Sequence, residues 1–270
     1  MASMEEAWHA NTPKQADEPG GLRSVAAALD LLECFATDEQ LGVTDIARRL
    51  GIAKSTAHRL LSTLRSRGFI EQDPESGRYQ LGLHLFELGH LAQIRNPLRI
   101  AGRPICLDLN RRTGLTVNLS VLDGADVVFL ERMESSESGR NLNEWGRRLP
   151  SHVASSGKAI AAWNAKFAAA RLEAGFPARA RNTVRTASQW EAVLRGVRKR
   201  GYATSSDESF EGSTSVAVPI LENPVEAYAA LSFFGRRHDM ETRLPLLVQL
   251  LQRSARRIAH DLVRIRAGGA

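Results

Sequence analysis

The chain has 270 residues, a length that accommodates two hydrophobic cores and therefore two domains. Its net charge of +6 hints at an anionic partner, but residues 1–90 hold 9 Lys and Arg against 13 Asp and Glu, so the total charge identifies none. The two cysteines, Cys34 and Cys106, have apolar neighbours, which argues against a disulfide framework or a metal site. No segment reads as a signal peptide or a membrane span. We therefore expect a cytoplasmic protein without metal or cofactor.

Residues 1–21 are predicted to form a flexible tail. The next segment has apolar residues at helical spacing, and these are Val25, Ala28, Leu29, Leu32 and Phe35. Ser24 precedes them and is a candidate N-cap. The pattern predicts a helix that packs this stripe against a small core.

Two short amphipathic helices are predicted on either side of Gly51, over residues 42–50 and from Lys54 onward. In the second, one stripe is apolar: Ala57, Leu60, Leu61 and Leu64. The opposite face carries hydroxyls and a guanidinium: Ser55, Arg59, Ser62 and Ser66, with His58 and Thr63 at its flanks. Two helices that meet at a glycine are typical of a helix-turn-helix, whose second helix fits a DNA major groove.

The charge of this segment favours DNA over a merely solvated face. Between Thr44 and Gly68 there are 6 Lys and Arg against Asp45 alone, an excess of 6 − 1 = +5, and no carboxylate follows Lys54. We expect contacts to base edges and nearby phosphates from Ser55, Thr56, His58, Arg59, Ser62 and Thr63. Contacts to the DNA backbone are expected from Lys54, Arg49 and Arg78, and Thr44 completes the predicted interface.

A hairpin is predicted directly after these helices. Residues 68–72 and 78–81 read as strands, and Asp73-Pro74-Glu75-Ser76-Gly77 between them is rich in turn formers. Three helices followed by a hairpin make a winged helix-turn-helix. Arg78, just past the turn, is placed to meet the backbone or the minor groove.

The remaining residues predict a second domain of α+β class with an antiparallel sheet. A leucine-rich helix ends before Pro97 and is followed by another helix over residues 98–113. Strands are expected at 116–122 and 127–132, joined by an Asp123-Gly124 turn, and again at 216–221 and 228–234. Helices are expected at 157–164, 167–174 and 188–200, and a long last helix has one apolar stripe from Leu244 to Leu262.

The order and spacing of these segments resemble the IclR family of bacterial transcriptional regulators over about residues 22–266. The similarity rests on Asp45-Ile46-Ala47-Arg48-Arg49-Leu50-Gly51, Lys54-Ser55-Thr56-Ala57-His58-Arg59-Leu60-Leu61, Tyr79-Gln80-Leu81-Gly82, Arg148-Leu149-Pro150-Ser151-His152, Ser156-Gly157-Lys158-Ala159, Arg200-Gly201-Tyr202, Ala217-Val218-Pro219 and Ala230-Leu231-Ser232. Ala53 departs from the pattern, because the family often has a capping Ser or Pro there.

The resemblance implies a domain order, a fold and an assembly. Residues 22–82 are expected to form the winged helix-turn-helix DNA-binding domain, 83–96 a linker helix, and 97–268 a GAF-like or profilin-like effector-binding domain. The expected assembly is a homodimer or a dimer of dimers, to which the linker helix contributes. The resemblance also implies a function. The protein is expected to be a sequence-specific regulator whose operator affinity or oligomeric geometry responds to a small organic effector.

The expected effector site begins at Ser155-Ser156-Gly157, where the start of a helix after a loop offers free N–H groups to an anion. The resemblance adds Ser205, Ser215, Ser232 and Phe234. Members that bind small keto acids often have an Asp, a Cys and a Ser at the equivalents of Ser205, Ser215 and Phe234. The substitutions favour a larger and less polar ligand, such as an aromatic carboxylic acid.

Two other classes of function are considered. A hydrolase whose winged helix only docks would use His152 and Ser155, but no nucleophile-elbow motif accompanies them, and no catalytic residue is assigned. A protein-interaction module would use its winged helix to bind another protein, and it would show no salt-dependent retention on DNA, whereas counterion release demands a steep loss of affinity with salt if DNA is the partner. The face without carboxylates argues against that module.

Overall fold

The computed structural model describes residues 22–135, 147–223 and 226–268. The predicted tail, residues 1–21, lies outside this part of the chain. The contacts divide the chain into two compact units between Ile94 and Arg95. Each unit has its own hydrophobic core, as the length suggested.

The first unit contains the predicted helices. These are α2 (Arg23–Glu33), the short 3-10 helix η1 (Cys34–Ala36), α3 (Val43–Leu50) and α4 (Lys54–Ser66). Gly51 ends α3 with a φ of 64°, a left-handed conformation that glycine adopts at little cost, and this sharp turn sets α4 across α3. The core between the helices contains Leu31, Ile46 and Leu61, all fully buried.

The prediction for α2 was wrong in two respects. Its N-cap is Leu22 rather than Ser24, and no side chain caps it. Val25 and Leu29 are exposed, because α2 packs on the other helices through Leu31 instead. Apolar residues occur on more than one side of this helix, so periodicity alone did not identify the side that packs.

The wing follows as predicted. Strands β1 (Ile70–Gln72) and β2 (Tyr79–Leu81) pair antiparallel, and Leu41 forms an additional bridge to Tyr79. At the end of β2, a Cβ added to Gly82 would lie 2.3 Å from the carbonyl oxygen of Gly68, so the chain can return this close to α4 only at a glycine. The winged helix-turn-helix prediction is confirmed.

Two consecutive helices lie on either side of the boundary between the units, α5 (Leu83–Arg95) before it and α6 (Pro97–Thr113) after it. Helix α5 contains no buried residue, and α6 begins immediately after it. Asn96 separates them, and its Oδ1 accepts a hydrogen bond from the Arg99 amide at 3.0 Å. Pro97 occupies the first turn of α6, where its missing N–H costs nothing.

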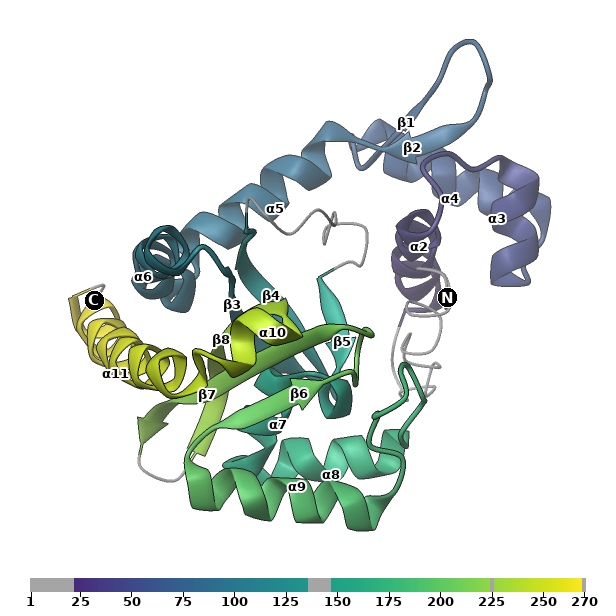
Figure 1. Cartoon of the computed structure of the whole chain (residues 1–270). Coiled ribbons are helices and arrows are strands. Elements are labelled where there is room, and N and C mark those ends of the chain that lie inside the picture. Colours follow the sequence, from purple (N-terminus) through teal and green to yellow (C-terminus); the bar gives the residue numbers. More distant parts are fainter. Residues whose placement is uncertain (1–21, 136–146, 224–225, 269–270) are drawn as a thin grey trace. The chain divides into compact units, whose positions relative to one another are not determined.

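The second unit is built on an antiparallel sheet in the order β5-β4-β3-β8-β7-β6 (Figure 1). Its strands are β3 (Thr116–Asp123), β4 (Asp126–Met133), β5 (Arg148–Pro150), β6 (Ala203–Ser206), β7 (Ser213–Asn223) and β8 (Glu226–Arg236). A register shift between Leu119 and Ser120 bends the β3–β4 pair. Strands β5 and β6 were not predicted.

Helices cover both faces of this sheet. On one face α6 and α11 (Leu244–Gly268) pack against the apolar residues of β3, β7 and β8. The other face is covered by η3 (Ser151–Val153), α7 (Ser155–Ala162), α8 (Ala165–Ala174) and α9 (Ala187–Arg200). A short α10 (Arg237–Glu241) precedes α11. The predicted α+β domain is confirmed, and no described helix is both long and apolar enough to cross a bilayer.

Candidate functional site

The polar face predicted for α4 lies on the surface of the first unit. Ala57 and Leu61 are buried, whereas the residues assigned to bases and phosphates are exposed: Lys54, Ser55, Thr56, His58, Arg59, Ser62 and Thr63. Within the described residues, the side chains of Ser55, His58 and Arg59 form no hydrogen bond or ion pair. Ala53 provides no side-chain cap, so the first N–H groups of α4 stay available to an anion.

Other predicted contacts are already engaged within the unit. Arg49 donates to Asp38 at 2.6 Å and to the Cys34 carbonyl at 3.1 Å, which joins α3 to η1. Arg78 donates to the Gln40 carbonyl at 3.0 Å and lies 3.5 Å from Asp45. The Thr63 hydroxyl donates to the Arg59 carbonyl within α4. Thr44 is exposed on α3.

A cavity opens on the face of the second sheet that α7 covers. The strand register explains its floor, because Asn118 on β3 pairs with Arg132 on β4 and with Ser232 on β8. In the adjacent row, Ser215 on β7 pairs with Phe234 on β8. The walls of the cavity are the first turn of α7 and the segment between β6 and β7. The cavity is lined by Asn118, Phe129, Arg132, Leu149, Ala154, Ser155, Ser156, Ser209, Phe210, Ser215, Ser232 and Phe234.

Arg132 is the cationic group of this cavity. Its guanidinium lies over the Phe129 ring, 4.5 Å from the centroid, and its Nε donates to Asn118 Oδ1 at 3.2 Å. Burial lowers the pKa of Arg132 to about 10, so the side chain stays charged at neutral pH. A held cation beside an aromatic ring and several hydroxyls suits a planar carboxylate.

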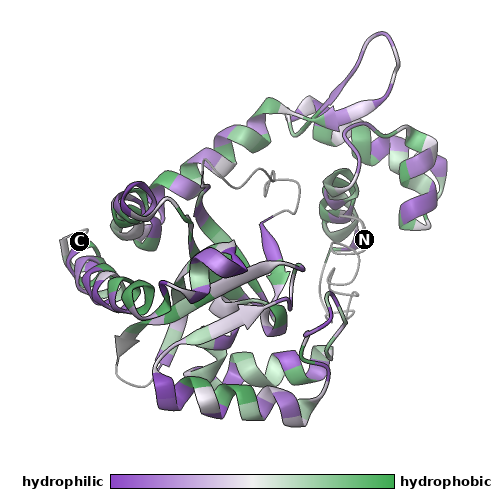
Figure 2. Ribbon diagram, viewed as in Figure 1, coloured by the Kyte–Doolittle hydropathy of each residue, from purple (hydrophilic) through white to green (hydrophobic). Residues whose placement is uncertain are grey.

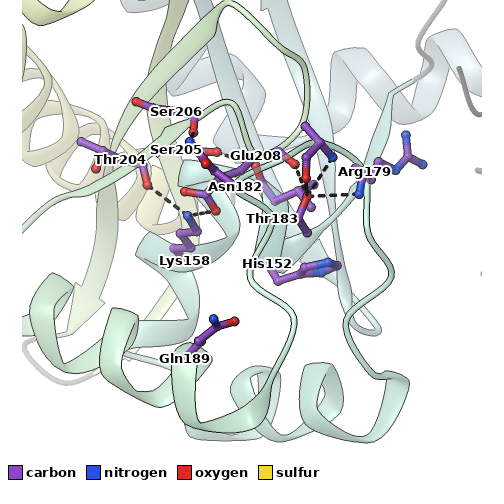
Figure 3. Close-up of polar contacts among 12 residues, drawn as sticks. His152, Lys158, Arg179, Asn182, Thr183, Gln189, Thr204, Ser205, Ser206 and Glu208 are labelled. Carbon is purple, nitrogen blue, oxygen red and sulfur yellow. Dashed lines mark hydrogen bonds and ion pairs between the residues drawn. The ribbon is translucent and has the colours of Figure 1, made fainter.

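The structure brings together five of the seven residues predicted for an effector: Ser155, Ser156, Ser215, Ser232 and Phe234. Ser205 does not line the cavity, because its hydroxyl donates to the Val153 carbonyl at 2.7 Å and joins β6 to η3. It lies beside Lys158 and Glu208 (Figure 3). Gly157 is also outside, since a Cβ there would lie 2.3 Å from the Ser151 carbonyl oxygen; its role is close packing.

Sequence reasoning missed Asn118 and Arg132. A signal was present, because Asn118 and Ser120 alternate with the buried Val117 and Leu119 along β3. Polar residues at regular positions of an otherwise apolar strand indicate a polar space on that face. The contribution of Ser209 and Phe210 had no such signal, since they lie between strands.

A wider groove of about 680 Å³ lies at another edge of the same sheet, around Arg236, Arg237 and Arg243. Each of these arginines has a partner in the chain. Arg237 pairs with Asp207, Arg236 with Asp239 at 2.8 Å, and Arg243 donates twice to the Thr113 carbonyl. Of the predicted effector residues only Phe234 borders it, so the smaller cavity is the better candidate.

Two protein-family models match the chain in the same order as the two units. Residues 24–74 match the IclR helix-turn-helix domain, and residues 91–260 match the model described as bacterial transcriptional regulator IclR C-terminal. The chain belongs to the IclR family. It is therefore a sequence-specific DNA-binding transcriptional regulator whose DNA binding responds to a small organic effector. The resemblance seen in the sequence is confirmed.

Relatives and solved structures agree with this membership. The HTH-type transcriptional regulator XynR of Escherichia coli is 36% identical over 215 residues, which cover 78% of this chain and 85% of XynR. An IclR-family regulator from Alicyclobacillus acidocaldarius has a TM-score of 0.77 at 27% identity, covering 90% and 99% of the two chains. An IclR homologue from Microbacterium hydrocarbonoxydans, solved with 4-hydroxybenzoate, also has a TM-score of 0.77, at 28% identity with 89% and 99% covered.

Membership in the IclR family decides against the hydrolase alternative, because the relatives are named as regulators. The geometry agrees. His152 is fully buried, its Nε2 lies 2.9 Å from the Pro177 carbonyl oxygen, and its ring packs edge-on against Phe176. Burial lowers the pKa of His152 to about 4. A neutral imidazole that donates to a backbone carbonyl holds the segment around Pro177 in place.

Proposed function

We propose that this IclR-family regulator works in the cytoplasm as a homodimer or dimer of dimers, and that its effector is an aromatic carboxylic acid. The observation that carries the effector class is Arg132, a half-buried cation held over the Phe129 ring at the floor of a serine-lined cavity. A carboxylate would pair with the guanidinium while an aromatic ring packs on Phe129 and Phe234.

The neighbour solved with 4-hydroxybenzoate supports this ligand class. The size of the cavity adds a condition, because it measures about 40 Å³, whereas ligand pockets commonly measure roughly 300–1,000 Å³. A benzoate therefore requires side chains at the rim to move. Phe210, half-buried between β6 and β7, is a large residue of this lining.

For DNA, we assign the exposed face of α4 to the major groove. Ser55, Thr56, His58, Arg59, Ser62 and Thr63 would meet base edges and nearby phosphates, with Arg59 the residue best able to bind guanine with two hydrogen bonds. Lys54 and Thr44 would hold the DNA backbone. Arg49 and Arg78 already position η1 and the wing, so any contact they make to phosphates would be shared with those roles.

The dimer is supported by apolar side chains that the chain leaves uncovered. Leu22, Val25 and Leu29 recur on one side of α2, and Leu83 and Phe86 are 64% and 71% exposed on α5. Figure 2 shows hydrophobic residues along both helices. Exposed leucines that share a helix face commonly mark a surface between subunits. A second copy of the chain is the partner that a regulator with paired half-sites requires.

Operator binding is tested by selecting fragments of the source genome at low salt and measuring their affinity by fluorescence anisotropy. We expect an enriched, roughly palindromic sequence and a linear fall of log affinity with log salt.

The dimer is tested by sedimentation. The Leu29→Asp variant should give monomers where the unchanged protein gives dimers. Recovery of no enriched sequence would reject the assignment of α4, and an unchanged dimer would reject the surface on α2.

The effector class is tested by calorimetric titration with 4-hydroxybenzoate, benzoate and pyruvate. We expect both aromatic acids to bind more tightly than pyruvate, and binding to change the anisotropy of the operator complex. Tighter binding of pyruvate than of either aromatic acid would overturn the proposed class.

A further inference from the structure

Residues 207–212 connect β6 to β7, and we call them the lid segment. Ser209 and Phe210, at its middle, line the cavity. The two ends of the segment are bound to the rest of the domain by contacts that do not involve the cavity. The lid segment is therefore a wall of the cavity whose position is fixed from outside.

The first anchor is the buried ion pair between Lys158 and Glu208. Lys158 lies on α7 with its side chain 2% exposed, Glu208 follows β6 at 13%, and the ammonium also donates to the Thr204 carbonyl at 3.1 Å. Figure 3 shows Lys158 reaching from its helix to Glu208 and Thr204. An ammonium and a carboxylate at these positions lose most of their hydration, and their mutual contact replaces a large part of it, so a shift that separates them is strongly opposed.

Further contacts hold the same end and close the segment on itself. The Thr183 hydroxyl donates to the Glu208 carbonyl at 2.8 Å, and the Asn182 amide donates to the Asp207 carbonyl at 3.0 Å. The Asp207 carboxylate pairs with Arg181 and Arg237 and accepts the Gly212 amide at 2.7 Å. The Phe210 carbonyl accepts the Ser213 hydroxyl at 2.6 Å, so the backbone is also held at the middle of the lid segment.

Helix α7 connects the anchor to the opposite wall. Ser155 and Ser156 in its first turn line the cavity, and Lys158 lies two residues further along. Gly157 between them contacts the Ser151 backbone so closely that α7 itself is fixed. The ion pair therefore sets the separation of the two walls between which a ligand enters.

We infer that Lys158 and Glu208 are positioning residues that limit the size of the effector, by allowing Phe210 to swing aside while preventing the lid segment from withdrawing. The inference rests on the proposed binding of aromatic acids in this cavity. A single-ring acid fits the space that one side chain vacates. A two-ring acid needs the backbone of the lid segment to move.

The test compares Lys158→Met, Glu208→Gln and the double variant that carries both changes. The double variant leaves no unpaired buried charge, so it separates the loss of the directed contact from misfolding. Arg171→Met is the matched control, because Arg171 and Asp126 form an ion pair that is 3% and 2% exposed and does not involve the lid segment. Each protein is titrated with 4-hydroxybenzoate and 2-naphthoate, and hydrogen exchange is followed in the peptide over residues 206–213.

We expect the unchanged protein to prefer 4-hydroxybenzoate. In the double variant this preference should shrink at least tenfold, and the lid peptide should exchange at least tenfold faster, at an unchanged thermal midpoint. Arg171→Met should lower the thermal midpoint and leave both the preference and the exchange of the lid peptide unaltered.

Unchanged exchange and an unchanged preference in the folded double variant would overturn the inference. If no protein binds either acid, the proposed effector class fails. The exchange data then decide whether the pair anchors the lid segment, because they need no ligand.

Discussion

Helix α4, which we propose reads DNA, and the cavity of the second domain are both rich in serine, but their polar groups are held in opposite ways. On α4 a single helix face presents exposed side chains, and the neighbours of Arg59 in the chain are sufficient to place it. In the cavity the polar groups come from several strands, from α7 and from the segment between β6 and β7, and Arg132 is fixed by Asn118 and Phe129. A surface that reads DNA can be mobile until it binds, whereas a buried ligand site must be arranged beforehand.

The largest expected effect is a loss of stability at acid pH, which comes from the burial of His152 in the second domain. Neutral His152 has a folded pKa of about 4 against an ordinary value of 6.5, and its Nδ1 has no partner among the described residues. A pKa lowered in the folded state means that stability is complete above pH 6.5 and is lost as the pH falls toward 4. The interval between these two pKa values corresponds to about 3 kcal/mol in the free energy of unfolding.

Thermal unfolding from pH 7 to pH 4.5 measures this effect. We expect His152→Gln, which keeps a donor for the Pro177 carbonyl, to lose less stability over that range than the unchanged protein. Arg59→Ala, in the other domain, should follow the unchanged protein. Equal acid sensitivity in His152→Gln and the unchanged protein would show that His152 does not carry the difference.

A second prediction tests whether the cavity holds its ligand through one charge. Arg132→Met should weaken binding of 4-hydroxybenzoate by roughly 10- to 150-fold, since a hydrogen bond to a charged group contributes about 1.5–3 kcal/mol. Calorimetry gives the dissociation constants, with Arg195→Met on the exposed side of α9 as control. An affinity within twofold of the unchanged protein would place the carboxylate elsewhere.

A third prediction addresses α4. Arg59→Ala should cost about 1–3 kcal/mol on the selected operator and little on a random duplex, because a two-pronged contact to guanine discriminates between bases. Anisotropy with both duplexes measures the ratio. Equal losses on the two duplexes would assign Arg59 to phosphates instead.

The smallest effect is expected at the wing. Arg78→Ala should weaken binding only a few-fold on every sequence and reduce the slope of log affinity against log salt by about 1. Because Arg78 also contacts the Gln40 carbonyl, thermal unfolding is recorded alongside. A loss confined to the operator would mean that the wing reads sequence.

The two regions also differ in how far the sequence alone predicts them. The face of α4 follows from a 3.6-residue period and a local charge excess, and the structure leaves it exposed as predicted. The cavity depends on register between strands far apart in the sequence, so Asn118 and Arg132 were missed, and most of the effector residues came from family resemblance. Strand β6, with the sequence Ala-Thr-Ser-Ser, has no apolar alternation and could not be recognised.

Helix α5 has 13 residues and fully buries none of them within one chain. Segments of this length are marginal as isolated helices in water, so in the proposed dimer the rigidity of α5 would come from association. The rigidity of α5 would then depend on the concentration of the protein, because the concentration sets the fraction of subunits that are dimeric. A newly made single subunit would then have two folded units joined by a flexible linker. Only after dimerisation would effector binding in the second unit be transmitted to the proposed DNA-binding unit.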